Sequence, residues 1–105
     1  MAKPYRYFEG SIVENELVNG CHHPVLSVLV IARDKREAKK RYIECIERNS
    51  VPSECLKINP GLCELIGAVE MINYQFTEEM KAELETYNSV LYCINRKVLE
   101  RILTV

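Results

Sequence analysis

Six lysine and arginine side chains stand within nine positions in the stretch "RDKREAKKR", residues 33–41. Cations gathered on one surface bind the phosphates of nucleic acids or the acidic side chains of another protein. Which of these is favoured depends on where the side chains point, and a helical wheel predicts this. The wheel puts Ala38 and Tyr42 on the inward stripe of a helix. The side chains on the opposite, outward side are those of Arg36, Lys39 and Lys40.

Part of this positive charge is balanced within the stretch. Glu37 stands four residues before Arg41, and Glu44 stands four residues before Arg48, which is the favourable orientation for local ion pairs. The chain has a formal net charge of -1 and a pI near 6.1, whereas proteins that bind phosphate backbones usually have a positive bias. Three interpretations of the outward face stay open: a solvated surface, a protein interface, or a nucleic-acid site.

One apolar residue, Ile43, falls among the charged outward positions. An apolar side chain inside a basic patch suits a protein interface better than a phosphate groove. The sequence therefore predicts a partner-binding face made of Arg33, Arg36, Lys39, Lys40 and Ile43.

The sequence "CHHP" places Cys21, His22 and His23 side by side before a proline. These residue types bind zinc or form a nucleophilic thiol-histidine pair. Adjacent residues rarely ligate one metal with good geometry, and no second metal-binding spacing occurs elsewhere in the sequence. No glycine pattern of a phosphate loop and no nucleophile elbow is present. We expect no metal, no cofactor and no enzymatic activity, with a thiol enzyme centred on Cys21 as the third hypothesis.

Length and composition predict a single domain over residues 1–105. The chain is 48% hydrophobic and 28% charged, which are the proportions of a folded globular protein. No apolar run approaches the length of about 18 residues that spans a bilayer, and the N-terminus does not resemble a signal peptide. We therefore expect a cytoplasmic protein with no membrane partner. Five cysteines, an odd number, fit reduced thiols in that compartment.

The hydrophobic pattern predicts the elements that would position these residues. Strands are predicted over 5–13 and 25–32, and the run "VLSVLVIA" in the second of these is the clearest central strand. A helix that begins after an aspartate cap is predicted over 34–48. Prolines and polar residues over 50–61 predict a loop. Alternating apolar residues predict a third strand over 68–76.

The C-terminal third contains no glycine or proline between residue 77 and residue 105. Its apolar positions form a seam close to a heptad repeat, which predicts one helix over 78–103. The alternative breaks this segment at Asn88 and Ser89, forms a fourth strand over 90–94 and begins a short helix near Asn95. The seam either packs in the core of the monomer or forms the interface of a homodimer. The candidate oligomer residues on the seam are Leu84, Leu91 and Val98.

Together these patterns predict an α+β fold. An antiparallel sheet of three to four strands carries one helix over 34–48 and is followed by a helical C-terminal region. The function expected by elimination is a small non-enzymatic module that binds another protein. Its size and lack of motifs are typical of phage or mobile-element accessory factors that inhibit host machinery. The alternative function is a small RNA- or DNA-binding protein that uses the basic helix 33–41.

Overall fold

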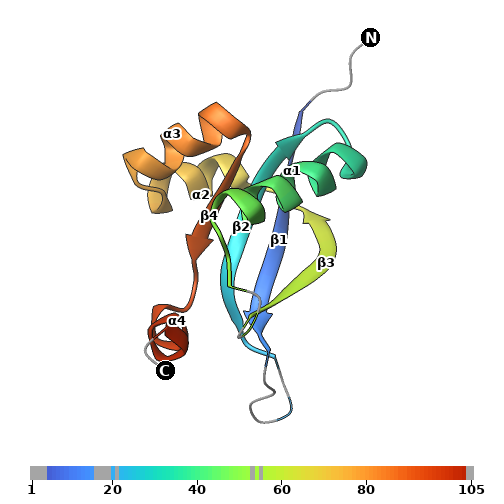
Figure 1. The fold of residues 1–105 in the computed structure, drawn as a ribbon. Coiled ribbons are helices and arrows are strands. Elements are labelled where there is room, and N and C mark those ends of the chain that lie inside the picture. Colours follow the sequence, from blue (N-terminus) through green and yellow to red (C-terminus); the bar gives the residue numbers. More distant parts are fainter. Residues whose placement is uncertain (1–4, 16–19, 21, 53, 55, 104–105) are drawn as a thin grey trace.

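The computed structural model describes residues 5–15, 20, 22–52, 54 and 56–103. An antiparallel sheet of four strands, in the order β3-β1-β2-β4, forms its centre (Figure 1). The strands are β1 (Arg6–Glu14), β2 (Pro24–Ala32), β3 (Leu56–Glu64) and β4 (Ser89–Cys93). The helices are α1 (Lys35–Arg48), α2 (Ala68–Gln75), α3 (Glu78–Tyr87) and α4 (Arg96–Leu103). The protein is therefore an α+β domain, as the sequence predicts.

β2 lies inside the sheet because both of its faces are apolar. Val28 and Val30 belong to the core on the α1 side, Leu29 belongs to the core on the α2 side, and all three are fully buried. A short β-branched run of this kind suits a strand that is covered on both faces. The expected central strand is confirmed.

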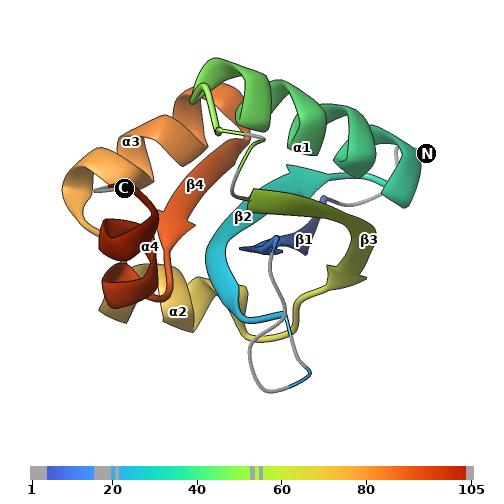
Figure 2. The same cartoon turned by 60° about the horizontal axis from the view of Figure 1, so that its bottom comes forward.

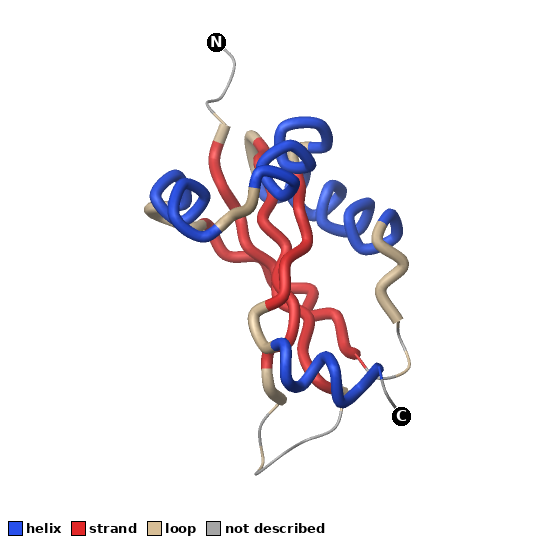
Figure 3. Tube along the Cα trace, turned by 90° about the vertical axis from the view of Figure 1, so that its left-hand side faces the viewer, coloured by secondary structure: helices blue, strands red, loops and turns tan. Residues whose placement is uncertain are grey.

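Helices cover both faces of the sheet. α1 lies on one face, α2 lies on the opposite face, and α3 lies along the upper part of β4 (Figure 2). Figure 3, which looks onto the β4 edge, shows α1 and α2 on opposite sides of the strands. α4 lies near the start of β2, where Val98 and Leu99 pack against the core on the α1 side.

Tyr42 holds α1 on the sheet. Its ring is buried over Gly10, and its hydroxyl lies within hydrogen-bond distance of the carbonyl oxygens of Ser11 (3.0 Å) and Asn59 (2.9 Å). The pairing of β1 with β3 shifts register at this point. The hydroxyl therefore reaches backbone acceptors where the regular ladder is interrupted.

Two elements between α1 and α3 differ from the sequence-based expectation. The predicted loop over 50–61 instead contains the first part of β3. Pro60 suggested a loop, but β3 is an edge strand, and an edge strand tolerates the missing N–H of a proline. The predicted third strand over 68–76 is α2 instead. Positions 68, 72 and 76 are spaced by four, so one set of apolar residues satisfies both the period of a strand and that of a helix. Ala68 and Phe76 are buried, whereas Tyr74 is 89% exposed.

The prediction of a single long C-terminal helix is also wrong. The alternative, in which a fourth strand and a short helix follow a break at Asn88, is confirmed. Asn88 adopts a left-handed conformation (φ 57°) and caps α3, and its N–H donates to the carbonyl oxygen of Leu84 at 2.8 Å. β4 then pairs with β2, where Val90 lies opposite Leu29 and is fully buried. Burial against the sheet therefore outweighs the helical periodicity of the segment.

Candidate partner-binding face

The start of α1 is organised around Asp34 and Glu37. The backbone N–H of Glu37 donates to the Asp34 side chain at 2.9 Å, which confirms the expected cap. The Glu37 carboxylate in turn accepts a hydrogen bond from the backbone N–H of Arg33 at 3.2 Å. Asp34 thus satisfies one N–H that the first turn leaves without a helical partner, and Glu37 binds the N–H of the residue that precedes the cap.

Glu37 also takes up two of the cations in the basic stretch. Its Oε2 lies 2.9 Å from Nη2 of Arg33, and its Oε1 lies 3.0 Å from Nη1 of Arg41. The hydrogen bond with Arg33 lowers the pKa of Glu37 and raises the pKa of Arg33. Arg41 donates further to the carbonyl oxygen of Ile31. Arg33 and Arg41 are therefore held by the protein itself.

The ion pair expected between Glu37 and Arg41 is confirmed, but Arg48 turns toward other elements. The Arg48 guanidinium lies 3.9 Å from the ring centre of Tyr87, donates to the carbonyl oxygen of Ser89 at 3.2 Å and lies 3.7 Å from Glu83. Arg48 therefore joins the end of α1 to α3 and β4. The spacing in the sequence predicted Glu44 as the partner of Arg48, but the folded chain places Glu83 and Ser89 within reach of Arg48 instead.

Four cations of the stretch remain, Lys35 among them, and three of these are the ones predicted to point outward from α1: Arg36, Lys39 and Lys40. All three are exposed, and none forms an ion pair with any residue in the described part of the chain. Ile43 lies beside them and is 45% exposed. The predicted outward orientation is confirmed. We call the surface of Arg33, Arg36, Lys39, Lys40 and Ile43 the basic face.

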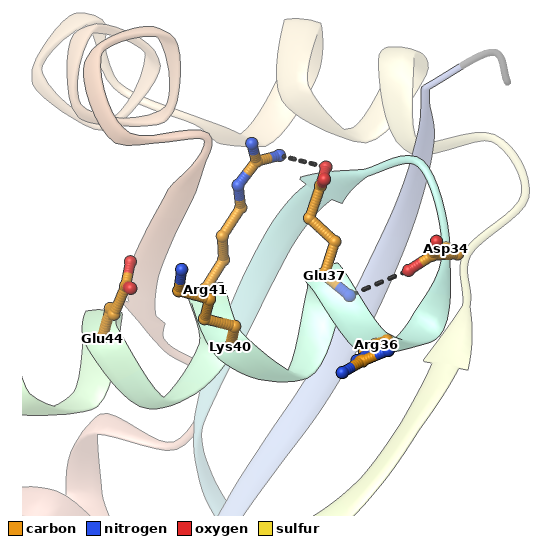
Figure 4. Close-up of a pocket in the computed structure, with 6 residues that line it drawn as sticks. All are labelled: Asp34, Arg36, Glu37, Lys40, Arg41 and Glu44. Carbon is orange, nitrogen blue, oxygen red and sulfur yellow. Dashed lines mark hydrogen bonds and ion pairs between the residues drawn. The ribbon is translucent and has the colours of Figure 1, made fainter. Parts of the chain in front are cut away.

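An open hollow runs along the basic face, and charges of both signs line it (Figure 4). Figure 4 shows Asp34 at one end of the hollow and Glu44 at the other, with Arg41 extended toward Glu37 between them. The lining residues are Asp34, Arg36, Glu37, Lys40, Arg41 and Glu44. Acidic and basic side chains are equal in number there. The hollow thus presents an alternation of charges rather than a positive surface.

The three residues of the expected seam lie on three separate elements. Leu84 is buried between α3 and the sheet, Leu91 is half-buried on β4, and Val98 is half-buried on α4. They therefore form no continuous helical stripe.

His22 and His23 lie close to a buried carboxylate, that of Glu14, which was not among the predicted site residues. His22 Nδ1 lies 2.9 Å from the carbonyl oxygen of Glu14, and His23 Nδ1 lies 3.6 Å from Oε2 of the Glu14 side chain. Arg101 of α4 donates to the other carboxylate oxygen. Glu14 is 5% exposed because it continues the inward positions Phe8, Gly10 and Ile12. The alternation of inward and outward side chains along β1 is the sequence signal that could have identified Glu14 as an inward residue.

The described cysteines are packing or surface groups. Cys45 is buried, and burial raises the pKa of its thiol. Cys63 and Cys93 are exposed on β3 and β4. The nucleophile of the third hypothesis, Cys21, lies outside the described residues.

No group of three or more potential metal ligands is brought together within residues 5–15, 20, 22–52, 54 and 56–103. In the same residues, no helix has both the length and the apolar character needed to cross a membrane.

Comparison with protein-family models, curated proteins and solved structures found no match to this chain.

Proposed function

We propose that the chain is a small non-enzymatic module that binds another protein through the basic face of α1. The observation that carries this proposal is the arrangement of Arg36, Lys39 and Lys40 around the half-exposed Ile43. These cations have no partners among the described residues, so their charge is available to a ligand. An apolar residue surrounded by charged groups has the organisation of a small protein interface, with an apolar centre and a polar rim.

The acidic residues of the hollow favour a protein partner over nucleic acid. A phosphate backbone that followed the hollow would approach Asp34 and Glu44 as closely as Arg36 and Lys40. Like charges at that range oppose binding. A protein surface can instead place carboxylates beside Arg36 and Lys40 and a cation beside Glu44.

The charges on the basic face define the chemistry of the partner. Its surface would carry carboxylates opposite Arg36, Lys39 and Lys40 and an apolar depression for Ile43. An accessory factor that inhibits host machinery would act by covering such a surface on its target. The charges would accelerate encounter, and the buried apolar contact would set the lifetime of the complex.

Charge reversal on the basic face tests the proposal. In the test variant Arg36, Lys39 and Lys40 are all changed to Glu. The matched control carries Lys57→Glu, Arg96→Glu and Lys97→Glu, three exposed cations on β3 and α4 with the same total change of charge. Because all six side chains are exposed, we expect both variants to keep the wild-type circular dichroism spectrum and melting temperature.

The three proteins are used for affinity capture from a lysate of the native host, with and without nuclease. We expect a stoichiometric protein partner that survives nuclease, binds the control variant and is lost with the basic-face variant. A separate Ile43→Ala variant should weaken capture as well. A partner retained by every variant would place the interface elsewhere on the molecule.

The alternative is a nucleic-acid-binding protein that uses the same cations, together with Arg33. It is favoured only by the local density of positive charge. Binding to phosphates should weaken steeply between low and physiological salt, whereas a complex anchored by Ile43 should weaken less. Nucleic acid in the eluate, with protein partners lost on digestion, would support this alternative.

A further inference from the structure

The exposed charges of α1 are sorted along the helix by sign. Its exposed cations, Arg36 and Lys40 among them, all precede Ile43, whereas its exposed acids, Glu44 and Glu47, follow it. None of these four charged residues forms an ion pair with a residue in the described part of the chain. The outward side of α1 is therefore positive near its start and negative near its end.

The four charged residues and Ile43 lie on one side of the helix. At about 100° per residue they fall within an arc of about 100°, opposite the buried stripe that packs on the sheet. Figure 4 shows Arg36, Lys40 and Glu44 following one another along α1. α1 is also an outer layer of the molecule, with the sheet on one side of it only (Figure 2). This side of the helix is therefore open to another molecule.

A surface with opposite charges at its two ends is complementary to itself when two copies run antiparallel. A two-fold axis that crosses α1 between Lys40 and Ile43 places Arg36 opposite the partner's Glu47. The same axis places Lys40 beside the partner's Glu44. The two Ile43 side chains then lie about 4.5 Å apart along the helix direction, close to the axis. Opposite charges thus surround an apolar centre, as in other protein interfaces.

We propose that α1 binds α1 of a second copy of the chain in this antiparallel arrangement. A second copy supplies carboxylates, cations and an apolar side chain in the order that the face requires. A parallel arrangement would instead place Arg36 opposite the partner's Arg36 and Glu47 opposite the partner's Glu47, and like charges oppose binding. The charge order of α1 therefore selects both the occupant and its direction.

The size of the contact sets the strength of the dimer. α1 has 14 residues and is about 21 Å long, so the contact between two such helices is small. We therefore expect a weak dimer in equilibrium with the monomer, and salt should weaken it further because exposed ion pairs are screened. This inference goes beyond the proposed function and does not depend on it. One face would hold either a second copy or a different protein, but not both at once.

Paired charge reversals test the arrangement in the full-length chain. The acidic variant carries Arg36→Glu and Lys40→Glu, which makes both ends of the outward side negative. The basic variant carries Glu44→Lys and Glu47→Lys, which makes both ends positive. The swapped variant carries all four substitutions, so the order of the charges is reversed and the side is complementary to itself again.

A matched control carries Lys57→Glu and Lys97→Glu, two exposed cations on β3 and α4 with the same change of charge as the acidic variant. Because all the substituted side chains are exposed, every variant should fold, and circular dichroism checks this. Sedimentation velocity of each purified protein, at low salt, under reducing conditions and over a concentration series, gives its mass and its dimer Kd.

We expect wild type and the control to approach twice the chain mass of 12.2 kDa at high concentration. The acidic and basic variants should each have a dimer Kd raised roughly 100-fold, because every substitution acts twice in a two-fold interface. The swapped variant should form a dimer as wild type does, and an equimolar mixture of the acidic and basic variants should form a heterodimer.

Three results would overturn the proposal. Wild-type protein could stay monomeric at its highest soluble concentration. A dimer could survive both paired reversals, which would place its interface elsewhere. The swapped variant could stay monomeric, which would show that the charges do not pair end to end. The proposed function is tested separately by the capture of a different protein from a lysate, which can succeed with a monomeric chain and can fail with a dimeric one.

Discussion

Gly10 and Tyr42 meet at the centre of the face that α1 covers. A Cβ atom on Gly10 would lie 2.5 Å from Cε1 of Tyr42 and 2.7 Å from Cδ2 of Leu62. Tyr42 is buried and its hydroxyl lies within hydrogen-bond distance of two carbonyl oxygens, so its ring cannot move aside without losing these contacts. The absence of a side chain at Gly10 is what allows the ring to lie on the sheet.

At this scale we predict that Gly10→Ala lowers the free energy of unfolding by about 1–3 kcal/mol, the usual cost of overpacking a core. Gly61→Ala is the matched control, because its new Cβ would lie 3.4 Å from the Asn59 side chain and has no closer neighbour in the described structure. Urea unfolding of the two variants measures the difference. Equal losses of stability would contradict the role assigned to the contact with Tyr42.

At the scale of the element, α1 begins where a side chain satisfies its first turn. Asp34 accepts from the N–H of Glu37, and Glu37 accepts from the N–H of Arg33 and pairs with Arg33 and Arg41. The helix therefore starts at a defined residue and holds the cations of the basic face in a fixed register. A loss of the cap would loosen the end of the helix that carries Arg36.

We predict that Asp34→Ala lowers the free energy of unfolding by about 1 kcal/mol, whereas Asp34→Asn stays close to wild type because an amide oxygen also caps helices. Thermal unfolding followed by circular dichroism distinguishes the two variants. A large loss in the Asn variant would mean that the charge of Asp34, and not its role as an acceptor for the N–H of Glu37, is what stabilises the start of α1.

At the scale of the whole molecule, two phenols, those of the buried Tyr42 and the half-buried Tyr92, link stability to pH. Burial raises the pKa of Tyr42 and that of Tyr92 to about 12 each, above the ordinary value of about 10. Between these values the folded chain keeps protons that the unfolded chain releases. These two groups therefore leave stability unchanged below about pH 10 and lower it as the pH rises toward 12.

We predict that the free energy of unfolding falls over this alkaline range in wild type and falls less steeply in Tyr42→Phe, which has no phenol to ionise at that position. Tyr74→Phe is the control, because Tyr74 is 89% exposed on α2 and should keep the wild-type slope. Urea unfolding at a series of pH values gives the slopes. Parallel curves for wild type and Tyr42→Phe would contradict the prediction.

The sequence by itself determined the features that depend on neighbouring residues. The cap at Asp34, the length of α1, its outward cations and the central strand β2 follow from local hydrogen-bonding chemistry and from runs of apolar residues. The prediction that Arg36, Lys39 and Lys40 are exposed was correct for the same reason. In a helix with a defined start, the helical period fixes which side chains face the sheet.

The tertiary structure decided the features that depend on distant partners. Residues 68–76 and 89–93 carry apolar patterns that suit more than one element. The first segment is a helix whose Ala68 joins a buried cluster with Leu29 of β2, and the second is a strand that pairs with β2. β3 escaped detection because its proline is acceptable only at an edge. The contact of Glu14 with Arg101 likewise arises only once the two ends of the chain lie beside each other. Long-range pairing carries no local signature, so only the folded chain shows it.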